Sequence, residues 1–150
     1  MSPPTRYPAD DPREWLNRAR SNLAKAHITK DSDDVYPEDV CFEAQQAAEK
    51  AIKGVLLSRG VDFPKVHDIA ELLTLVSESG ITLPDQVAAA TELTDYAVVT
   101  RYPGLGGEVS NEDCDDAITC AEAVVQWAER VVGSDENGTG AASSGAASDA

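Results

Sequence analysis

Apolar residues recur at intervals of three or four positions in five segments of the chain, and no run of useful length alternates in the manner of a β-strand. The first predicted helix begins at Pro12, because Asp10 and Asp11 can cap free amides and proline is tolerated in a first turn. The sequence therefore predicts an all-α fold. The apolar positions of this first helix are Trp15, Ala19, Leu23 and Ala26.

The second predicted helix runs from about Glu38 to Arg59, and Gly60 is its expected stop. Gln45 lies beside the apolar face, so we expect a buried hydrogen-bond partner for its side chain. This helix is predicted to be the central one of the fold. Its apolar face is formed by Cys41, Ala44, Ala48, Ile52 and Val55.

Three further helices follow in the sequence, separated by proline and glycine. The third ends at Gly80, the fourth opens at Pro84, and the fifth begins near Ser110 and ends near Val132. Residues 133–150 contain no large apolar side chain, so we expect them to form a disordered tail. The predicted organisation is an arm over residues 1–10, one helical domain over 11–132, and a tail over 133–150.

The formal net charge of −15 repels nucleic-acid backbones, so nonspecific nucleic-acid binding by the whole surface is disfavoured, although a local basic pocket is compatible with it. This charge fits an ordinary soluble acidic protein or one from a salt-adapted organism. No apolar run is long enough to span a bilayer, and the N-terminus has proline and acidic residues where a signal peptide has a basic start. We therefore expect a cytoplasmic protein that does not enter the membrane.

The three cysteines, Cys41, Cys114 and Cys120, form no CxxC motif and are interpreted as reduced packing residues. With only His27 and His67 as further ligands of the kind zinc prefers, a structural zinc site would require scattered residues to gather. We expect no metal and no cofactor.

Two blocks of sequence carry a specific series of motif residues. The first, DVCFEAQQAAEKAIKGVLLSRGVDFPKVHDIAELL, holds a Phe-x-x-Gln-Gln-Ala-x-Glu-Lys-x-x-Lys helix and a Pro-x-x-His-Asp turn. The second, LTDYAVVTRYPG, holds a Tyr and an Arg-Tyr-Pro. In this order the two blocks resemble the HEPN family. With the helices at either end, the resemblance covers roughly residues 11 to 132.

The resemblance implies an up-and-down bundle of four long helices plus a shorter one, commonly a homodimer, that is often encoded beside a small nucleotidyltransferase. Many HEPN proteins are ribonucleases that use an arginine followed, after four to six residues, by a histidine. Counted from Arg101, those positions hold Gly106, Gly107 and Glu108. The usual catalytic histidine is missing, and Glu108 is a conceivable substitute base that would also repel a phosphate.

Arg20 and His27 have six residues between them, as in the family motif. They stand in the first helix, away from the segment where the family keeps its motif. We interpret this spacing as coincidence, and we assign no catalytic residue.

Six residues are candidates for ligand binding, and each has a structural alternative. Lys50 and Lys53 share part of the outer face of the second helix with Gln46, as solvated surface or as a phosphate-facing patch. His67 caps the turn before the third helix or contacts a ligand. The others, Tyr96, Arg101 and Tyr102, anchor the glycine-rich loop or form the rim of a pocket in which Arg101 reads an anion.

Three functions remain open from the sequence. The first is an accessory HEPN-like protein that forms a homodimer, acts with a nucleotidyltransferase-like partner and binds a nucleotide phosphate near Arg101. The second is a ribonuclease toxin of a toxin-antitoxin pair with a displaced catalytic base. The third is a purely structural helical interaction module that binds no nucleotide.

Overall fold

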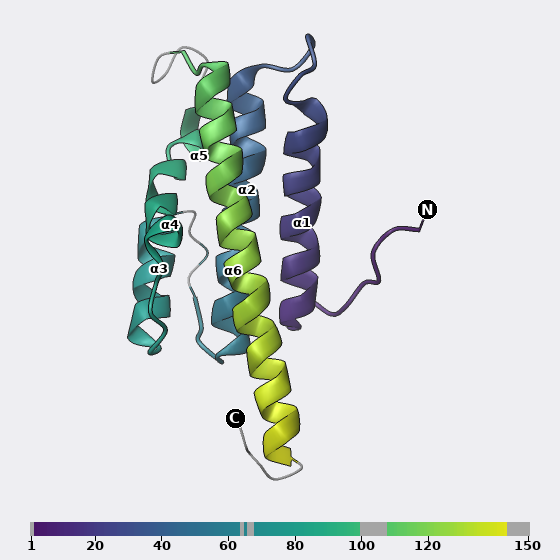
Figure 1. Ribbon diagram of the computed structural model, residues 1–150, viewed down its shortest axis with the longest axis vertical. Helices are drawn as coiled ribbons and strands as arrows, with labels where there is room; N and C mark the ends of the chain where they lie inside the picture. The colour runs from purple at the N-terminus through teal and green to yellow at the C-terminus, as the bar shows by residue number, and fades with distance from the viewer. Residues whose placement is uncertain (1, 64, 66–67, 100–107, 144–150) are drawn as a thin grey trace.

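The computed structural model describes residues 2–63, 65, 68–99 and 108–143, and the side chains of 98, 99 and 135–143 are outside that description (Figure 1). The described residues form helices and no strand, which confirms the all-α prediction. The long helices are α1 (Pro12–Thr29), α2 (Pro37–Ser58) and α6 (Asn111–Ser143). The shorter elements are α3 (Ile69–Glu78), α4 (Asp85–Ala88), the 3-10 helix η1 (Ala89–Leu93) and α5 (Tyr96–Val99).

Local sequence signals set most of the helix boundaries. Helix α1 begins at Pro12 as predicted, and the carboxylate of Asp11 accepts a hydrogen bond from the backbone N–H of Arg13. At the start of α6, Ser110 and Asp113 form the predicted reciprocal capping pair, with both hydrogen bonds at 3.0 Å. These caps satisfy amides that have no partner inside the helix.

Two glycines end helices where the backbone turns into the left-handed region. Gly60 follows α2 with φ at 68°, and Gly80 follows α3 with φ at 99°. Residues with a Cβ rarely adopt these angles, so glycine is favoured at both positions. The predicted stops at Gly60 and Gly80 are confirmed.

Helix α2 lies in the middle of the bundle, with α1 and α6 packed along it (Figure 1). Helix α1 runs antiparallel to both of them. Helices α2 and α6 begin at the same end, where the sulfur atoms of Cys41 and Cys114 are 3.6 Å apart. At the other end of α2, a Cβ on Gly54 would stand 3.3 Å from the Cβ of Trp15, so the absence of a side chain lets α1 come close.

The predicted apolar face of α2 is buried at every position, which confirms its role as the central helix. Trp127 of α6 is buried, and so are the apolar residues of this helix that recur at helical spacing: Ala117, Ile118, Ala121, Val124, Val125, Ala128 and Val132. In α1 the prediction is partly right, because Ala19 and Ala26 are buried, Leu23 is partly buried, and Leu16 and Asn22 are buried without having been predicted.

The predicted fourth helix is broken into α4, η1 and α5 (Figure 1). Helix α4 and η1 pack against α6, whereas α5 packs against α2. The last break falls at Thr94 and Asp95, two residues with low helix propensity whose short side chains compete for backbone hydrogen bonds. The hydroxyl oxygen of Thr94 accepts a hydrogen bond of 3.1 Å from the backbone N–H of Ile69 at the start of α3. This contact joins two segments that are far apart in sequence.

Helix α6 runs to Ser143, past the predicted end near Val132. Because the side chains after Ser134 are outside the described part, the expectation of a disordered tail over 133–150 stays a prediction. No helix of the described residues combines the length and the apolar character needed to cross a bilayer.

Candidate functional site

The motif of the central helix places three polar side chains on one buried face of α2. Gln45, Glu49 and Lys53 follow one another at intervals of four residues, so they lie in line along the helix. They are only 0%, 2% and 7% exposed. Polar groups this deeply buried are stable only when they are hydrogen-bonded or paired.

Hydrogen bonds join these side chains into one chain, which we call the buried polar row. The side-chain amide of Gln45 donates to Glu49 Oε1 at 2.8 Å, and Lys53 Nζ donates to Glu49 Oε2, also at 2.8 Å. Gln46 extends the row by donating to Gln45 Oε1 at 2.8 Å. The expectation of a buried hydrogen-bond partner for Gln45 is confirmed, and that partner is Glu49.

The position predicted for Lys53 on the outer face of the second helix is wrong. The carboxylate of Glu49 neutralises its ammonium, and the ring of Phe63 covers it, with Lys53 Nζ 5.7 Å from the ring centroid. The ring of Trp15 packs edge-on against Phe63 at 5.8 Å, so α1 closes this end of the row. A lysine can be buried here because its charge has a partner on the next turn of the same helix.

Lys50 lies between α1 and α2 and is half-buried. Its ammonium donates to Asn22 Oδ1 at 2.9 Å, while the amide of Asn22 donates to Glu43 Oε1 at 2.7 Å. Burial lowers the pKa of Lys50, and the nearby positive charge of Lys25 lowers it further. Lys50 therefore joins the two helices, and it does not share one surface patch with Lys53.

Tyr96 begins α5 and is half-buried beside the starts of α2 and α6. Burial raises the pKa of its phenol, and the neighbouring Cys41 adds to that shift. Burial likewise raises the pKa of the Cys41 thiol. Cys41 and Lys53 are twelve residues apart on one helix, an axial distance of about 18 Å. The fold thus keeps Tyr96 well away from the lysines of α2.

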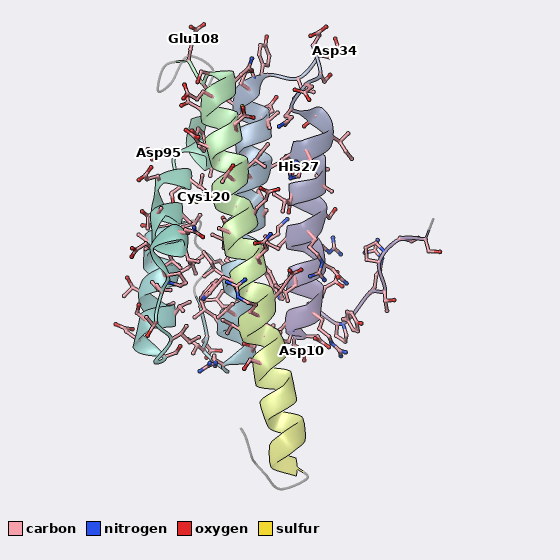
Figure 2. All side chains as sticks on the ribbon, viewed as in Figure 1. Asp10, His27, Asp34, Asp95, Glu108 and Cys120 are labelled. Carbon is pink, nitrogen blue, oxygen red and sulfur yellow. The ribbon has the colours of Figure 1, made fainter. Side chains whose placement is uncertain are left out.

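The candidates Arg101, Tyr102 and His67 lie outside the described residues. Glu108, the conceivable substitute base, is exposed at the end of the bundle where α6 begins (Figure 2).

Arg20 and His27 belong to a row of polar contacts between α1 and α6. The guanidinium of Arg20 pairs with Glu129, and His27 Nε2 lies 2.7 Å from Glu122 Oε2 on the side of α1 that faces α6 (Figure 2). Lys30 continues the row toward Asp115 at 3.5 Å. The antiparallel course of the two helices produces this register, and it supports the interpretation that the spacing of Arg20 and His27 is coincidental.

The cysteines carry free thiols. Burial raises the pKa of the thiols of Cys41, Cys114 and Cys120, which keeps them protonated at neutral pH. Among the residues that the structure describes, no group of three or more histidine, cysteine or acidic side chains is arranged to hold a metal ion.

Sequence reasoning missed Glu49 as the centre of the buried row and Asn22 as a buried polar link. The signal for Glu49 was present, because a Gln-Glu-Lys series at intervals of four residues predicts side chains in line. Nothing in the sequence marked Asn22, whose partners Glu43 and Lys50 belong to another helix.

Comparison with known proteins agrees with this geometry. The family model for the HEPN domain matches residues 12–131. The crystal structure of an archaeal HEPN homologue matches with a TM-score of 0.64 and 29% identity, over 81% of this chain and 98% of the homologue. A search of curated proteins found no significant match. The chain belongs to the HEPN domain family.

Proposed function

We propose that this protein is an accessory, non-catalytic HEPN protein that acts with a nucleotidyltransferase-type partner and binds a nucleotide phosphate near Arg101. An arginine suits this task, because its planar fork can donate two parallel hydrogen bonds to phosphate. Arg101 also precedes a segment rich in glycine, a residue that has no side chain to keep a ligand from the backbone amides.

The pairing of His27 with Glu122 is the observation that carries this proposal. His27, which follows Arg20, is the histidine of this chain that has the family's arginine-to-histidine spacing. Its ring and the guanidinium of Arg20 each meet a carboxylate of α6. A general base must reach the hydroxyl whose proton it removes, and these two residues instead hold two helices together.

The segment after Arg101 supports the same conclusion. Glycine or Glu108 stands where a ribonuclease of this family has its histidine. The loss of a general base typically lowers a rate by about 10²–10⁴-fold. Binding of an anion requires only the donors, so it can persist where catalysis does not.

Calorimetric titration with ATP, GTP and AMP tests the binding part of the proposal. We expect saturable binding by the wild type and a loss of about tenfold or more in Arg101→Lys, which keeps the charge but removes the fork. Arg130→Lys is the matched control, because Arg130 is an exposed arginine on α6. Equal binding by the Arg101 and Arg130 variants would contradict a role for Arg101.

The partner and the homodimer are supported by family membership. Analytical ultracentrifugation of the purified protein, alone and mixed with the product of a neighbouring nucleotidyltransferase-like reading frame, tests both. We expect a dimer alone and a larger species in the mixture. A monomer that forms no complex would contradict this part of the proposal.

A further inference from the structure

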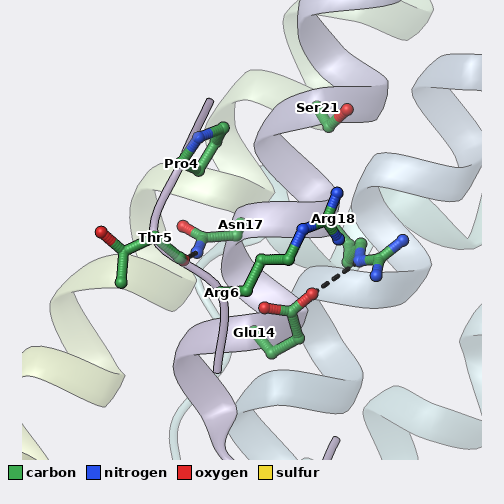
Figure 3. Close-up of a pocket in the computed structure, with 7 residues that line it drawn as sticks. All are labelled: Pro4, Thr5, Arg6, Glu14, Asn17, Arg18 and Ser21. Atoms are coloured by element: carbon green, nitrogen blue, oxygen red, sulfur yellow. Dashed lines mark hydrogen bonds and ion pairs between the residues drawn. The ribbon is translucent and has the colours of Figure 1, made fainter. Parts of the chain in front are cut away.

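The N-terminal arm lies along α1 and encloses a small pocket with it (Figure 3). The side-chain amide of Asn17 donates to the carbonyl oxygen of Thr5 at 2.7 Å, and the backbone N–H of Tyr7 donates to Glu14 Oε1 at 2.9 Å. These two bonds fix the arm on either side of Arg6. The side chain of Arg6 is thereby held against the helix although it belongs to an extended segment.

Two arginines line this arm pocket. Arg6 comes from the arm and Arg18 from α1, and Figure 3 shows both side chains beside Glu14, with Ser21 one turn further along the helix. The pocket has a volume of about 100 Å³, which is room for several water molecules. That space suits one compact oxyanion group and is too small for a whole nucleotide.

The carboxylate in the pocket is already fully engaged. Glu14 Oε1 accepts the hydrogen bond from Tyr7, and Oε2 accepts one of 2.7 Å from Arg18 Nε. The hydrogen bond from Tyr7 lowers the pKa of Glu14, and the bond from Arg18 lowers it further, so the group stays ionised at neutral pH. The positive charge of Arg6 also lowers the pKa of Glu14. Glu14 therefore positions the arm and Arg18, and its single negative charge balances only one of the two positive charges.

Donors of hydrogen bonds remain unused in the pocket. Within the described part of the chain, the guanidinium of Arg6 makes no hydrogen bond or ion pair, and neither does the hydroxyl of Ser21. Arg18 uses its Nε for Glu14, which leaves its terminal amino groups. A pocket that presents one excess positive charge and several free donors is complementary to an anion.

The charge distribution of the whole chain makes this pocket distinctive. The net charge is −15, yet the first 30 residues hold six of the 12 lysines and arginines against three acidic residues. Arg20 and Lys30 are used in the ion pairs with α6, whereas Arg6 and Arg18 line the arm pocket. Positive charge is thus gathered here in a protein whose overall field repels anions.

We propose that the arm pocket, formed by Arg6, Arg18 and Ser21 around Glu14, binds a phosphate group. The fork of each arginine matches the spacing of phosphate oxygens, and the serine hydroxyl adds a third donor. The phosphate is either a free ion or the terminal group of a nucleotide whose remainder lies outside the pocket. This site is separate from Arg101, and it stands or falls independently of the function proposed above.

Titration of isotopically labelled protein with inorganic phosphate tests the site by NMR, with sodium chloride at matched ionic strength as the reference. We expect saturable shifts of the Arg6, Arg18 and Ser21 signals, with a dissociation constant on the order of 1 mM for a single exposed anion site. Arg6→Gln and Arg18→Gln should each weaken binding about tenfold or more. Arg130→Gln, which removes the same charge from α6, should change it less than twofold.

A parallel titration with ATP separates the two sources of phosphate. Tighter binding of ATP than of inorganic phosphate, lost in Arg6→Gln, would assign a nucleotide, whereas equal affinities would assign the free ion. Circular dichroism melts of the variants check the fold, which should be unchanged because Arg6 is exposed. The inference is overturned if the wild type shows no saturable shifts, if Arg6→Gln binds as the wild type does, or if Arg101→Lys abolishes phosphate binding.

Discussion

Replacing Lys53 with methionine should destabilise the protein by about 3–5 kcal/mol, because the carboxylate of Glu49 would remain buried without its ammonium partner. Both side chains are nearly inaccessible, and the bond between them is 2.8 Å long. Methionine keeps an unbranched side chain of similar length, so the loss of stability reports the removal of the charge rather than a change in side-chain volume. For a domain of this size the melting temperature should fall by roughly 10–15 °C.

A double-mutant cycle isolates the pair. Glu49→Gln alone leaves the Lys53 ammonium buried against Phe63, whereas Glu49→Gln combined with Lys53→Met leaves no charge in the buried polar row. The double variant should therefore be more stable than the sum of the two single losses implies, by about 1–3 kcal/mol. Replacing a buried ion pair as a unit is often nearly neutral, whereas removing one member is not.

Urea unfolding at neutral pH, followed by circular dichroism, gives the free energy of unfolding of the wild type, the two single variants and the double variant. Lys25→Met serves as the control, since the Lys25 side chain is 56% exposed and its loss should change stability by less than about 0.5 kcal/mol. If Lys53→Met costs no more than Lys25→Met, or if the single losses simply add, the buried ion pair at the centre of α2 does not exist as described.

Three other predictions concern the core, the tail and the response to alkali. Ile52→Ala should lower the free energy of unfolding in urea by roughly 2–5 kcal/mol, because Ile52 is fully buried in the central helix and its removal leaves a cavity. An unchanged free energy of unfolding would place that face of α2 at the surface. Removing residues 134–150 should lower the melting temperature by less than about 4 °C, because no large apolar side chain is lost there; a greater drop would show that the tail packs on the bundle. Burial raises the pKa of Cys41 and Tyr96, so at alkaline pH the folded protein keeps protons that the unfolded chain releases. The free energy of unfolding should therefore be constant below about pH 8 and fall above about pH 9. The fall should reach at most about 1.4 kcal/mol per pH unit for each group. A flat profile between pH 8 and pH 10.5, or an identical slope in Cys41→Ala, would contradict the burial of that cluster.

The spacing of apolar residues predicted the central helix well, because α2 is packed against other helices along much of its length and most of its buried positions are apolar. Cys41, Ile52 and Val55 fall on one face at helical spacing, and all three are buried. The same reasoning misplaced Lys53, since a helical wheel shows the direction of a side chain but not what covers it. Phe63, which comes from the segment after α2, supplies that cover.

The segment after Pro84 shows where local pattern fails. Its apolar residues recur at helical intervals, so the sequence predicted one continuous helix. The chain is instead divided, and at the last break Thr94 bonds to the start of α3. Such a contact between distant segments overrides a weak local preference, and it cannot be read from a sequence window.

The candidate site was predicted only in part for the same reason. Motif residues marked α2 as special, yet the sequence analysis placed Lys53 on the outer face, whereas Lys53 forms a buried pair with Glu49. Arg6 and Arg18 were not recognised at all, because twelve positions separate them and only the path of the arm brings them together. Pairing of Arg20 and His27 with α6 likewise depends on the register of two helices that are far apart in the chain.

A cleavage assay tests whether this HEPN protein, which we propose binds anions, leaves RNA intact. Purified wild-type protein at micromolar concentration is incubated with labelled single-stranded and hairpin RNA, beside Arg101→Lys and a buffer blank. We expect the wild type and the variant to leave the RNA as intact as the buffer blank does. Rapid cleavage by the wild type that Arg101→Lys abolishes would contradict it and would identify a ribonuclease with a displaced base.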